Sequence, residues 1–134
     1  MLPFSPRLRI ALATAELVAK EQQRPAVRCS DIMAGIVSLA GGVADNLLRA
    51  RGFSCPVPAV PLTAVNHDPV SYSIGSLRAF SGAMHEAASR SRGLVGNEDM
   101  LVGILSTPDG EITALLAKKS VNVEELLSEV RRQM

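Results

Sequence analysis

Three residues of this 134-residue chain have the side-chain types of a hydrolytic triad: Cys29 as nucleophile, His85 as base and Asp99 as the group that orients the base. Their spacing matches no catalytic motif. When the two halves of the chain are aligned, Cys29 falls opposite Asn97 at a predicted helix start, and His85 falls opposite Leu17 on a helix flank. We therefore predict that the chain is not an enzyme. A small hydrolase stays an alternative, which activity lost on Cys29→Ala would support.

Motifs that hold nucleotides or metals are absent from the sequence. It contains no Gly-x-x-x-x-Gly-Lys phosphate loop, and its three lysines are Lys20, Lys118 and Lys119. Cys29 and Cys55 form neither a C-x-x-C pair nor a disulfide framework, so two free thiols are expected. The sequence therefore predicts no cofactor and no metal site.

The charge balance argues against nucleic acid as a partner. The chain carries 14 Lys plus Arg against 13 Asp plus Glu, a net charge of +1, and has neither a basic stripe nor aromatic platforms for bases. A helical DNA-binding protein is the second alternative, which a salt-sensitive shift of labelled DNA would support. The first residues lack the apolar stretch of a signal peptide, and no apolar run is long enough to cross a bilayer. We therefore expect a cytoplasmic protein with no membrane contact.

The chain repeats itself at an offset of 68 residues. Residues 4–52 align with 72–120 without a gap, and thirteen of the 49 aligned positions are identical, where chance would supply roughly three or four. The identical pairs include Ser5/Ser73, Arg24/Arg92, Asp31/Asp99, Gly35/Gly103 and Ile36/Ile104. With 47% hydrophobic but only 3% aromatic residues, the core must consist of small and aliphatic side chains, which favours close-packed helices. We predict an all-α fold of two repeats related by a pseudo-twofold axis.

Apolar residues at helical spacing open each copy and predict helices over about 6–21 and 74–90. In the second copy the buried stripe is expected to comprise Leu77, Phe80, Ala83, Met84 and Ala87. A turn then leads to a second helix in each copy, for which Asn97 is the predicted N-cap in the second copy. A third helix is predicted to start near Gly42 or Gly110.

Gly35 and Gly103 fall in the middle of the two second helices. Glycine in a helix interior costs about 1 kcal/mol relative to alanine. We therefore predict that another helix approaches closely at both positions. The first-turn acids Glu98 and Asp99 place negative charge where the helix dipole favours it.

The two copies diverge after their third helices. The second continues into a fourth helix, for which Asn122 is the predicted cap. The first runs into residues 53–71, where Pro56, Pro58, Pro61 and Pro69 exclude a long helix. Residues 1–134 are accordingly divided into repeat one (4–52), an extended connector (53–71) and repeat two (72–134). The apolar connector residues are expected to lie along the helices: Val57, Val60, Leu62 and Val65.

This order of features resembles the Clp amino-terminal domain (Clp-N), a double four-helix module of Clp unfoldases that also occurs alone. The resemblance covers residues 4–132 and includes the aromatic-Ser-Pro-Arg start, the acid-led second helix with a central Gly, and the ending Val-Asn-Val-Glu-Glu-Leu. In the first copy a Pro-rich connector replaces the fourth helix. The family's second helix usually reads Gly-Thr-Glu-His-Leu-Leu-Leu-Gly-Leu-Leu, and residues 96–105 read Gly-Asn-Glu-Asp-Met-Leu-Val-Gly-Ile-Leu.

The resemblance implies a protein-recognition module that binds substrate proteins or adaptors for an ATPase ring, in the same chain or in a partner. Some family members bind arginine-phosphorylated segments through the Glu that leads the second helix, near the Thr that opens the copy. Carried over residue by residue, the second copy keeps Glu98, with Ser73 for the Thr, but replaces the usual Pro-Arg-Ala-Lys with residues 74–77, Ile-Gly-Ser-Leu. The first copy keeps Ser5, Pro6 and Arg7 but has Ser30 in place of the Glu.

The candidate ligand-binding residues are therefore Glu98, Ser73, Ser5 and Arg7. Neither copy holds a complete site of this kind. Two roles stay open for Glu98 on the sequence alone. Its carboxylate can accept charge-assisted hydrogen bonds from a guanidinium, or it can act as a first-turn charge that stabilises its helix.

Overall fold

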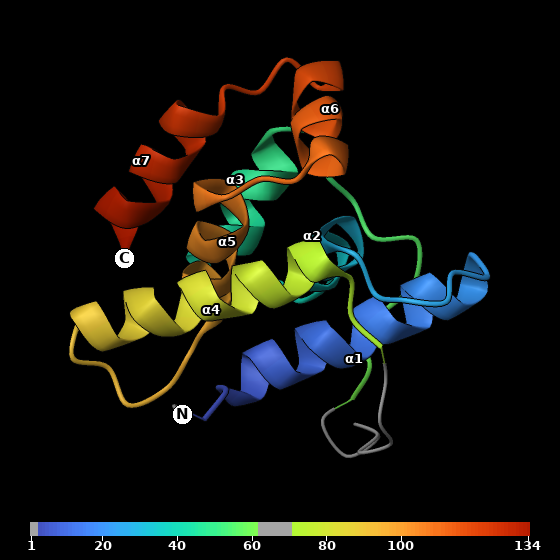
Figure 1. Ribbon diagram of the computed structural model, residues 1–134, viewed down its shortest axis with the longest axis horizontal. Helices are drawn as coiled ribbons and strands as arrows, with labels where there is room; N and C mark the ends of the chain where they lie inside the picture. Colours follow the sequence, from blue (N-terminus) through green and yellow to red (C-terminus); the bar gives the residue numbers. More distant parts are fainter. Residues whose placement is uncertain (1–2, 62–70) are drawn as a thin grey trace.

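Helices form the described chain, and their ends repeat at the offset found in the sequence. The computed structural model describes residues 3–61 and 71–134, and the helices of that part are α1 (Pro6–Glu21), α2 (Cys29–Ser38), α3 (Val43–Ala50), α4 (Ile74–Ser89), α5 (Asn97–Ser106), α6 (Gly110–Lys118) and α7 (Val123–Gln133) (Figure 1). Both ends of α1 and α4, and of α2 and α5, coincide when shifted by 68 residues. The predicted all-α repeat fold is confirmed.

The serines conserved between the copies begin the long helices. Ser5 Oγ accepts a hydrogen bond of 3.1 Å from the Leu8 N–H, and Ser73 Oγ accepts one of 3.1 Å from the Ser76 N–H. Each therefore satisfies one of the backbone donors that a helix start leaves free. Proline follows only in the first copy, where Pro6 is the first residue of α1 and its fixed φ suits that position.

The mid-helix glycines lie where two helices touch through their backbones, as predicted. A Cβ built on Gly103 of α5 would lie 2.2 Å from the carbonyl oxygen of Ala79 in α4, and one on Gly35 of α2 would lie 2.0 Å from that of Ala11 in α1. Gly82 of α4 faces Gly103 in turn, since its own Cβ would approach the Gly103 Cα to 3.1 Å. Neither second helix can therefore carry a side chain at this point.

The repeated aspartates cap the second helices from within. Asp99 is the third residue of α5, and its Oδ2 accepts a 2.8 Å hydrogen bond from the backbone N–H of Gly96, while its Oδ1 pairs with Arg92. Asp31 of α2 bonds the Arg28 N–H at 3.0 Å and pairs with Arg24 in the same way. Gly96, and not Asn97, is therefore the N-cap, and the prediction for Asn97 is wrong. Gly96 has no side chain to offer as a cap, and the Asp99 carboxylate supplies only the reciprocal bond to the Gly96 N–H.

Two short backbone pairings connect the copies crosswise. The lead-in to α1 pairs with the lead-in to α5, where Ser5 N donates to Val95 O at 2.9 Å and Val95 N donates to Pro3 O at 2.8 Å. The lead-in to α4 pairs equally with the lead-in to α2, through Val27 N to Ser71 O and Ser73 N to Val27 O, both 2.9 Å. Each first helix therefore begins beside the second helix of the other repeat.

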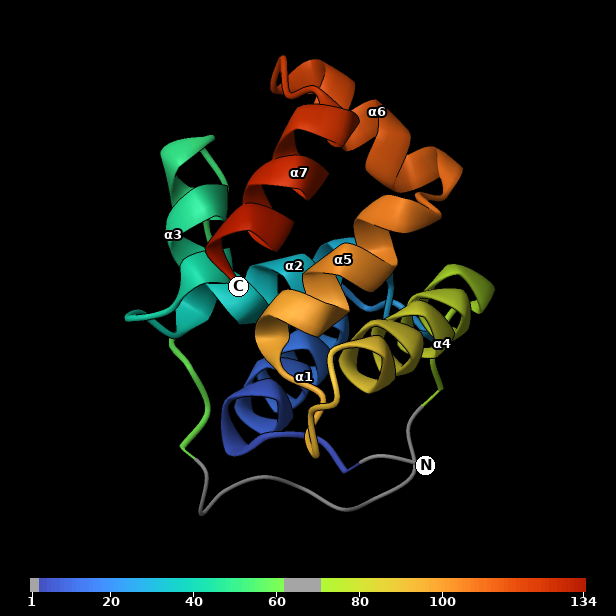
Figure 2. The ribbon, with the colours of Figure 1, turned by 90° about the vertical axis from the view of Figure 1, so that its left-hand side faces the viewer.

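The fourth helix, α7, closes the second repeat. Asn122 caps it as predicted, since Asn122 Oδ1 accepts from the Glu125 N–H at 3.0 Å. Leu126 and Val130 are buried as α7 lies across α3 and α5 (Figure 2). Burial alone raises the pKa of Glu86 in α4, but hydrogen bonds from Arg90 and from Arg131 of α7 outweigh it and bring the pKa below its ordinary value. A charged network therefore joins the end of α7 to α4.

The described part of the connector follows the first repeat without forming a helix. Phe53 is buried, and the backbone N–H of Val60 donates to Thr14 Oγ1 of α1 at 3.0 Å. Residues 53–61 therefore run along the helices as predicted, while Leu62, Val65 and Pro69 lie outside the described residues. Within the described ranges no single helix is long and apolar enough to cross a membrane; α2 with α3, and α5 with α6, reach that length only together, across bends of 106° and 99°.

Candidate functional site

The crosswise pairing gathers helix starts from both repeats at two places. At the first, which we call the α1–α3–α5 junction, Ser5 pairs with the lead-in to α5, and the Arg7 guanidinium donates to the carbonyls of Leu39 and Ala40, just before α3. At the second, the α2–α4–α6 junction, Ser73 pairs with the lead-in to α2, and Gly75 lies against Asp109 at the start of α6. The two junctions are related by the 68-residue offset.

The α1–α3–α5 junction unites three of the four candidate ligand-binding residues. Glu98 lies in the first turn of α5, three residues after Val95, and its side chain is half-buried. Ser5 and Arg7 come from the other repeat. The backbone pairing therefore brings Ser5 of one copy to the lead-in of the helix that carries Glu98 in the other copy. Ser73 belongs to the α2–α4–α6 junction, away from Glu98.

This junction presents both signs of charge. The Arg7 guanidinium is 43% exposed although it bonds two carbonyls, and it lies 3.7 Å from the buried Asp45 carboxylate, so it is held in place. Its position at the start of α1 also lies at the positive end of the helix dipole. The Glu98 carboxylate belongs to the neighbouring helix. Such an arrangement suits a ligand that carries a cation and an anion together.

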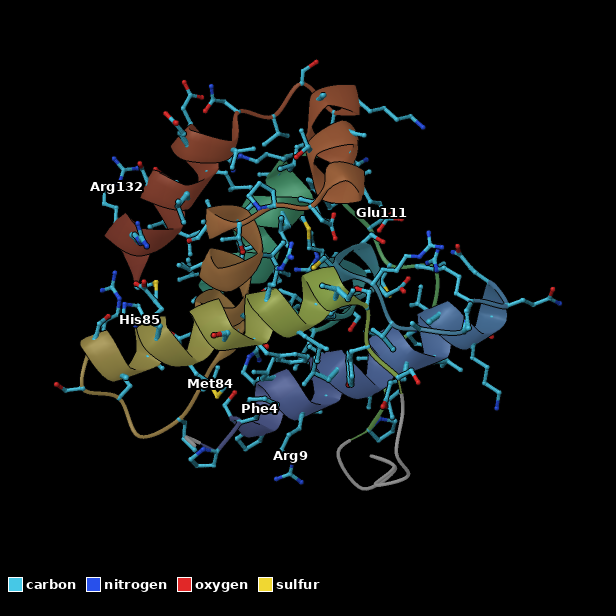
Figure 3. The ribbon with its side chains drawn as sticks, in the orientation of Figure 1. Phe4, Arg9, Met84, His85, Glu111 and Arg132 are labelled. Atoms are coloured by element: carbon cyan, nitrogen blue, oxygen red, sulfur yellow. The ribbon has the colours of Figure 1, made fainter. Side chains whose placement is uncertain are left out.

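The α2–α4–α6 junction obtains its carboxylate from a residue that the repeat does not predict. Ser30 stands where the second copy has Glu98, and its hydroxyl donates to Glu111 Oε1 of α6 at 2.8 Å. Arg28 Nη1 donates to Glu111 Oε2 at 2.9 Å. Glu111, at the start of α6 (Figure 3), aligns with Val43, so internal comparison of the sequence gave no signal for it.

The hypothetical triad is not assembled. Cys29 is buried, with its sulfur 3.9 Å from Ser76 Oγ, and Asp99 is engaged by Arg92 and Gly96. His85 lies exposed on α4 (Figure 3). Burial, and next the negative charge of Asp109, raises the pKa of Cys29 to about 11. Its thiol is therefore neutral near pH 7 and a poor nucleophile.

We expect Cys29 to resist alkylation in the folded chain. A pKa of about 11 instead of 9.0 reduces the thiolate fraction at pH 8 by roughly a hundred-fold, because each unit by which the pKa rises lowers that fraction about ten-fold. Cys55 is less buried and should react first with iodoacetamide, as peptide mass spectrometry over time would show. After unfolding in guanidinium, both should react at similar rates. Modification of Cys29 as fast as Cys55 in the folded protein would contradict this account.

No cluster of three metal-binding side chains occurs among the residues that the structure describes. A surface pocket of about 630 Å³, open to solvent, lies between the end of α3 and α7, and no junction residue named above lines it. Its lining is largely charged: Arg51, Asn122, Glu124, Glu125, Ser128, Glu129 and Arg132.

Clp amino-terminal domains share the fold of this chain, a pseudo-twofold pair of helical repeats. The amino-terminal domain of ClpD, a caseinolytic protease associated chaperone from Arabidopsis thaliana, matches with a TM-score of 0.68 at 17% identity, over 96% of this chain and 92% of that one. The Hsp104 amino-terminal domain from Candida albicans matches with a TM-score of 0.65 at 12% identity, over 96% and 89%. No family profile matches the sequence. The fold that the resemblance implied is therefore confirmed.

Proposed function

We propose that this chain is the protein-recognition module of a Clp-type unfoldase or protease system. In this proposal it binds substrate proteins or adaptors and delivers them to an ATPase ring, in the same chain or in a partner protein. The observation that carries the proposal is the fold, which nearly the whole chain shares with amino-terminal domains of two chaperones. The sequence adds support, because it contains no phosphate loop with which the chain could itself use ATP.

The ligand proposed for the α1–α3–α5 junction is a protein segment that carries phosphorylated arginine. Such a residue has a guanidinium group and a phosphate on one side chain. The Glu98 carboxylate would accept hydrogen bonds from the guanidinium, while Arg7 and the start of α1 would attract the phosphate. Ser5 supports this site as the cap that fixes the first turn of α1. Ser73 does the same for α4 at the other junction.

The delivery role can be tested with a Clp ATPase ring from which the native amino-terminal domain has been removed. This chain would be fused to the ring, or added separately, and ATP-dependent unfolding of an arginine-phosphorylated fluorescent reporter would be followed. We expect faster unfolding than with the truncated ring alone. Stimulation by the fused chain alone indicates a module acting in the same chain, and stimulation by the added chain indicates a stand-alone regulator. Equal rates with and without the chain in both formats would contradict the proposal.

A further inference from the structure

The Glu111 carboxylate at the α2–α4–α6 junction already holds a guanidinium of the same chain. Arg28 Nη1 lies 2.9 Å from Glu111 Oε2, and the Ser30 hydroxyl orients the other carboxylate oxygen at 2.8 Å. Both charged side chains stay accessible, with 46% of Arg28 and 36% of Glu111 exposed. An exposed ion pair of this kind is weak, so an incoming group of the same chemistry can replace Arg28.

This junction differs from its counterpart in the charge that α4 contributes. Gly75 occupies the position of Arg7, and a Cβ built on Gly75 would lie 2.3 Å from Asp109 Oδ2. The space of the arginine is therefore filled by the Asp109 carboxylate, which also caps α6 through the Ile112 N–H at 2.9 Å. Two carboxylates at the start of α6 repel a phosphate but favour a cation. Arg78, one turn further along α4, is exposed and forms no ion pair with a described residue.

Exposed apolar side chains flank the same helix start. Ile74 is 70% and Leu77 is 55% exposed, and with Leu94 they are the large apolar residues most exposed in the described chain. The expectation that Leu77 belongs to the buried stripe of α4 is wrong, because the first turn of α4 buries Ser76 instead. Ile74 and Leu77 are three residues apart and so share one face of the helix. Ile74 directly precedes Gly75, the residue of α4 that lies against the Asp109 carboxylate of the α6 start.

We propose that the α2–α4–α6 junction binds an unphosphorylated arginine of a partner protein segment at Glu111, displacing Arg28, while Ile74 and Leu77 contact apolar residues next to that arginine. The ligand chemistry follows from the guanidinium that already occupies Glu111, and the apolar neighbours follow from the exposed face of α4. The inference rests on the proposed recognition function. It assigns the two junctions different ligands, a phosphorylated arginine at one and an arginine among apolar residues at the other.

The test uses the full ¹⁵N-labelled chain and a ten-residue acetylated peptide with a central Leu-Arg-Leu. Amide NMR signals of Ser30, Ile74 and Leu77 should shift on titration, and a matched peptide with neutral citrulline in place of arginine should leave them unmoved. E111Q should weaken this binding about two- to five-fold, because the pair that it removes is as exposed as the one that Arg28 forms. R28Q should strengthen it about two- to five-fold, because the internal competitor is removed. E98Q, at the other junction, should have no effect.

Unchanged binding by both E111Q and R28Q would overturn the proposal, as would unmoved amides at this junction in wild type and R28Q alike. Thermal unfolding of E111Q shows whether the variant folds; if it does not, the R28Q affinity alone decides. Failure of the proposed recognition function would give different results. That failure would appear as unmoved signals around Glu98 with a phosphoarginine peptide, and as no stimulation of an ATPase ring.

Discussion

Gly103→Ala should lower the free energy of unfolding by about 3 kcal/mol, the upper end of the range for overpacked cores. The added methyl carbon would lie 2.2 Å from the carbonyl oxygen of Ala79 and 2.8 Å from the backbone nitrogen of Ala83. Both atoms belong to the backbone of α4, so no side-chain rotation relieves the clash and the two helices must separate. Chemical denaturation followed by circular dichroism measures the loss. We expect a similar loss for Gly35→Ala, whose added methyl carbon would lie 2.0 Å from the carbonyl oxygen of Ala11.

Gly110→Ala is the matched control. Gly110 is the first residue of α6, and a Cβ built there meets nothing within 4 Å. This variant should unfold at the same denaturant concentration as wild type or slightly higher, since alanine is the better helix former. If Gly103→Ala proves as stable as Gly110→Ala, α4 and α5 can part without cost and close backbone contact is not the reason for the glycine.

The parts of the fold that could be predicted from the sequence are those whose contacts occur once in each copy. Asp99 binds the lead-in to its own helix, and Gly103 touches the first helix of its own repeat. Each such contact constrains the same residue type twice, at positions 68 residues apart. Identity between the copies therefore predicts these helices and the contacts within each repeat.

Contacts between the copies left marks that do not reveal the partner. Val27 and Val95 are identical, and Phe4 and Tyr72 are both aromatic, at aligned positions. Their pairings, Val27 with Tyr72 and Val95 with Phe4, run through the backbone, so the sequence did not indicate that first helices meet the second helices of the other repeat. Glu111 has no counterpart in the first copy. The sequence therefore indicated the candidate residues one by one, but not that Ser5 and Arg7 of one copy lie at the same junction as the start of α5 in the other.

The site proposed at the α1–α3–α5 junction has a measurable consequence at Glu98. Glu98→Gln should weaken binding of a phosphoarginine peptide roughly ten- to a hundred-fold, because the carboxylate loses a charge-assisted pair of about 1.5–3 kcal/mol. The melting temperature should hardly change, since a first-turn acid stabilises its helix by only about 0.3–1 kcal/mol. Fluorescence anisotropy of a labelled peptide gives the affinity. Glu21→Gln, on the exposed end of α1, is the control for the same loss of charge.

Combining Glu98→Gln in the second copy with Arg7→Gln in the first tests whether the site is shared between the repeats. If Glu98 and Arg7 bind the two charged groups of one phosphoarginine, Arg7→Gln should weaken the phosphorylated peptide about ten-fold and leave the unphosphorylated peptide unchanged. Glu98 and Arg7 would contact the same side chain of the ligand. The losses of affinity caused by the two substitutions should therefore be less than additive in the double variant. Ser73→Ala should not reduce the affinity, because Ser73 lies at the α2–α4–α6 junction. A Ser73→Ala loss as large as that of Arg7→Gln would mean that the ligand is bound within one copy, and that the crosswise pairing of the helix starts does not form the site.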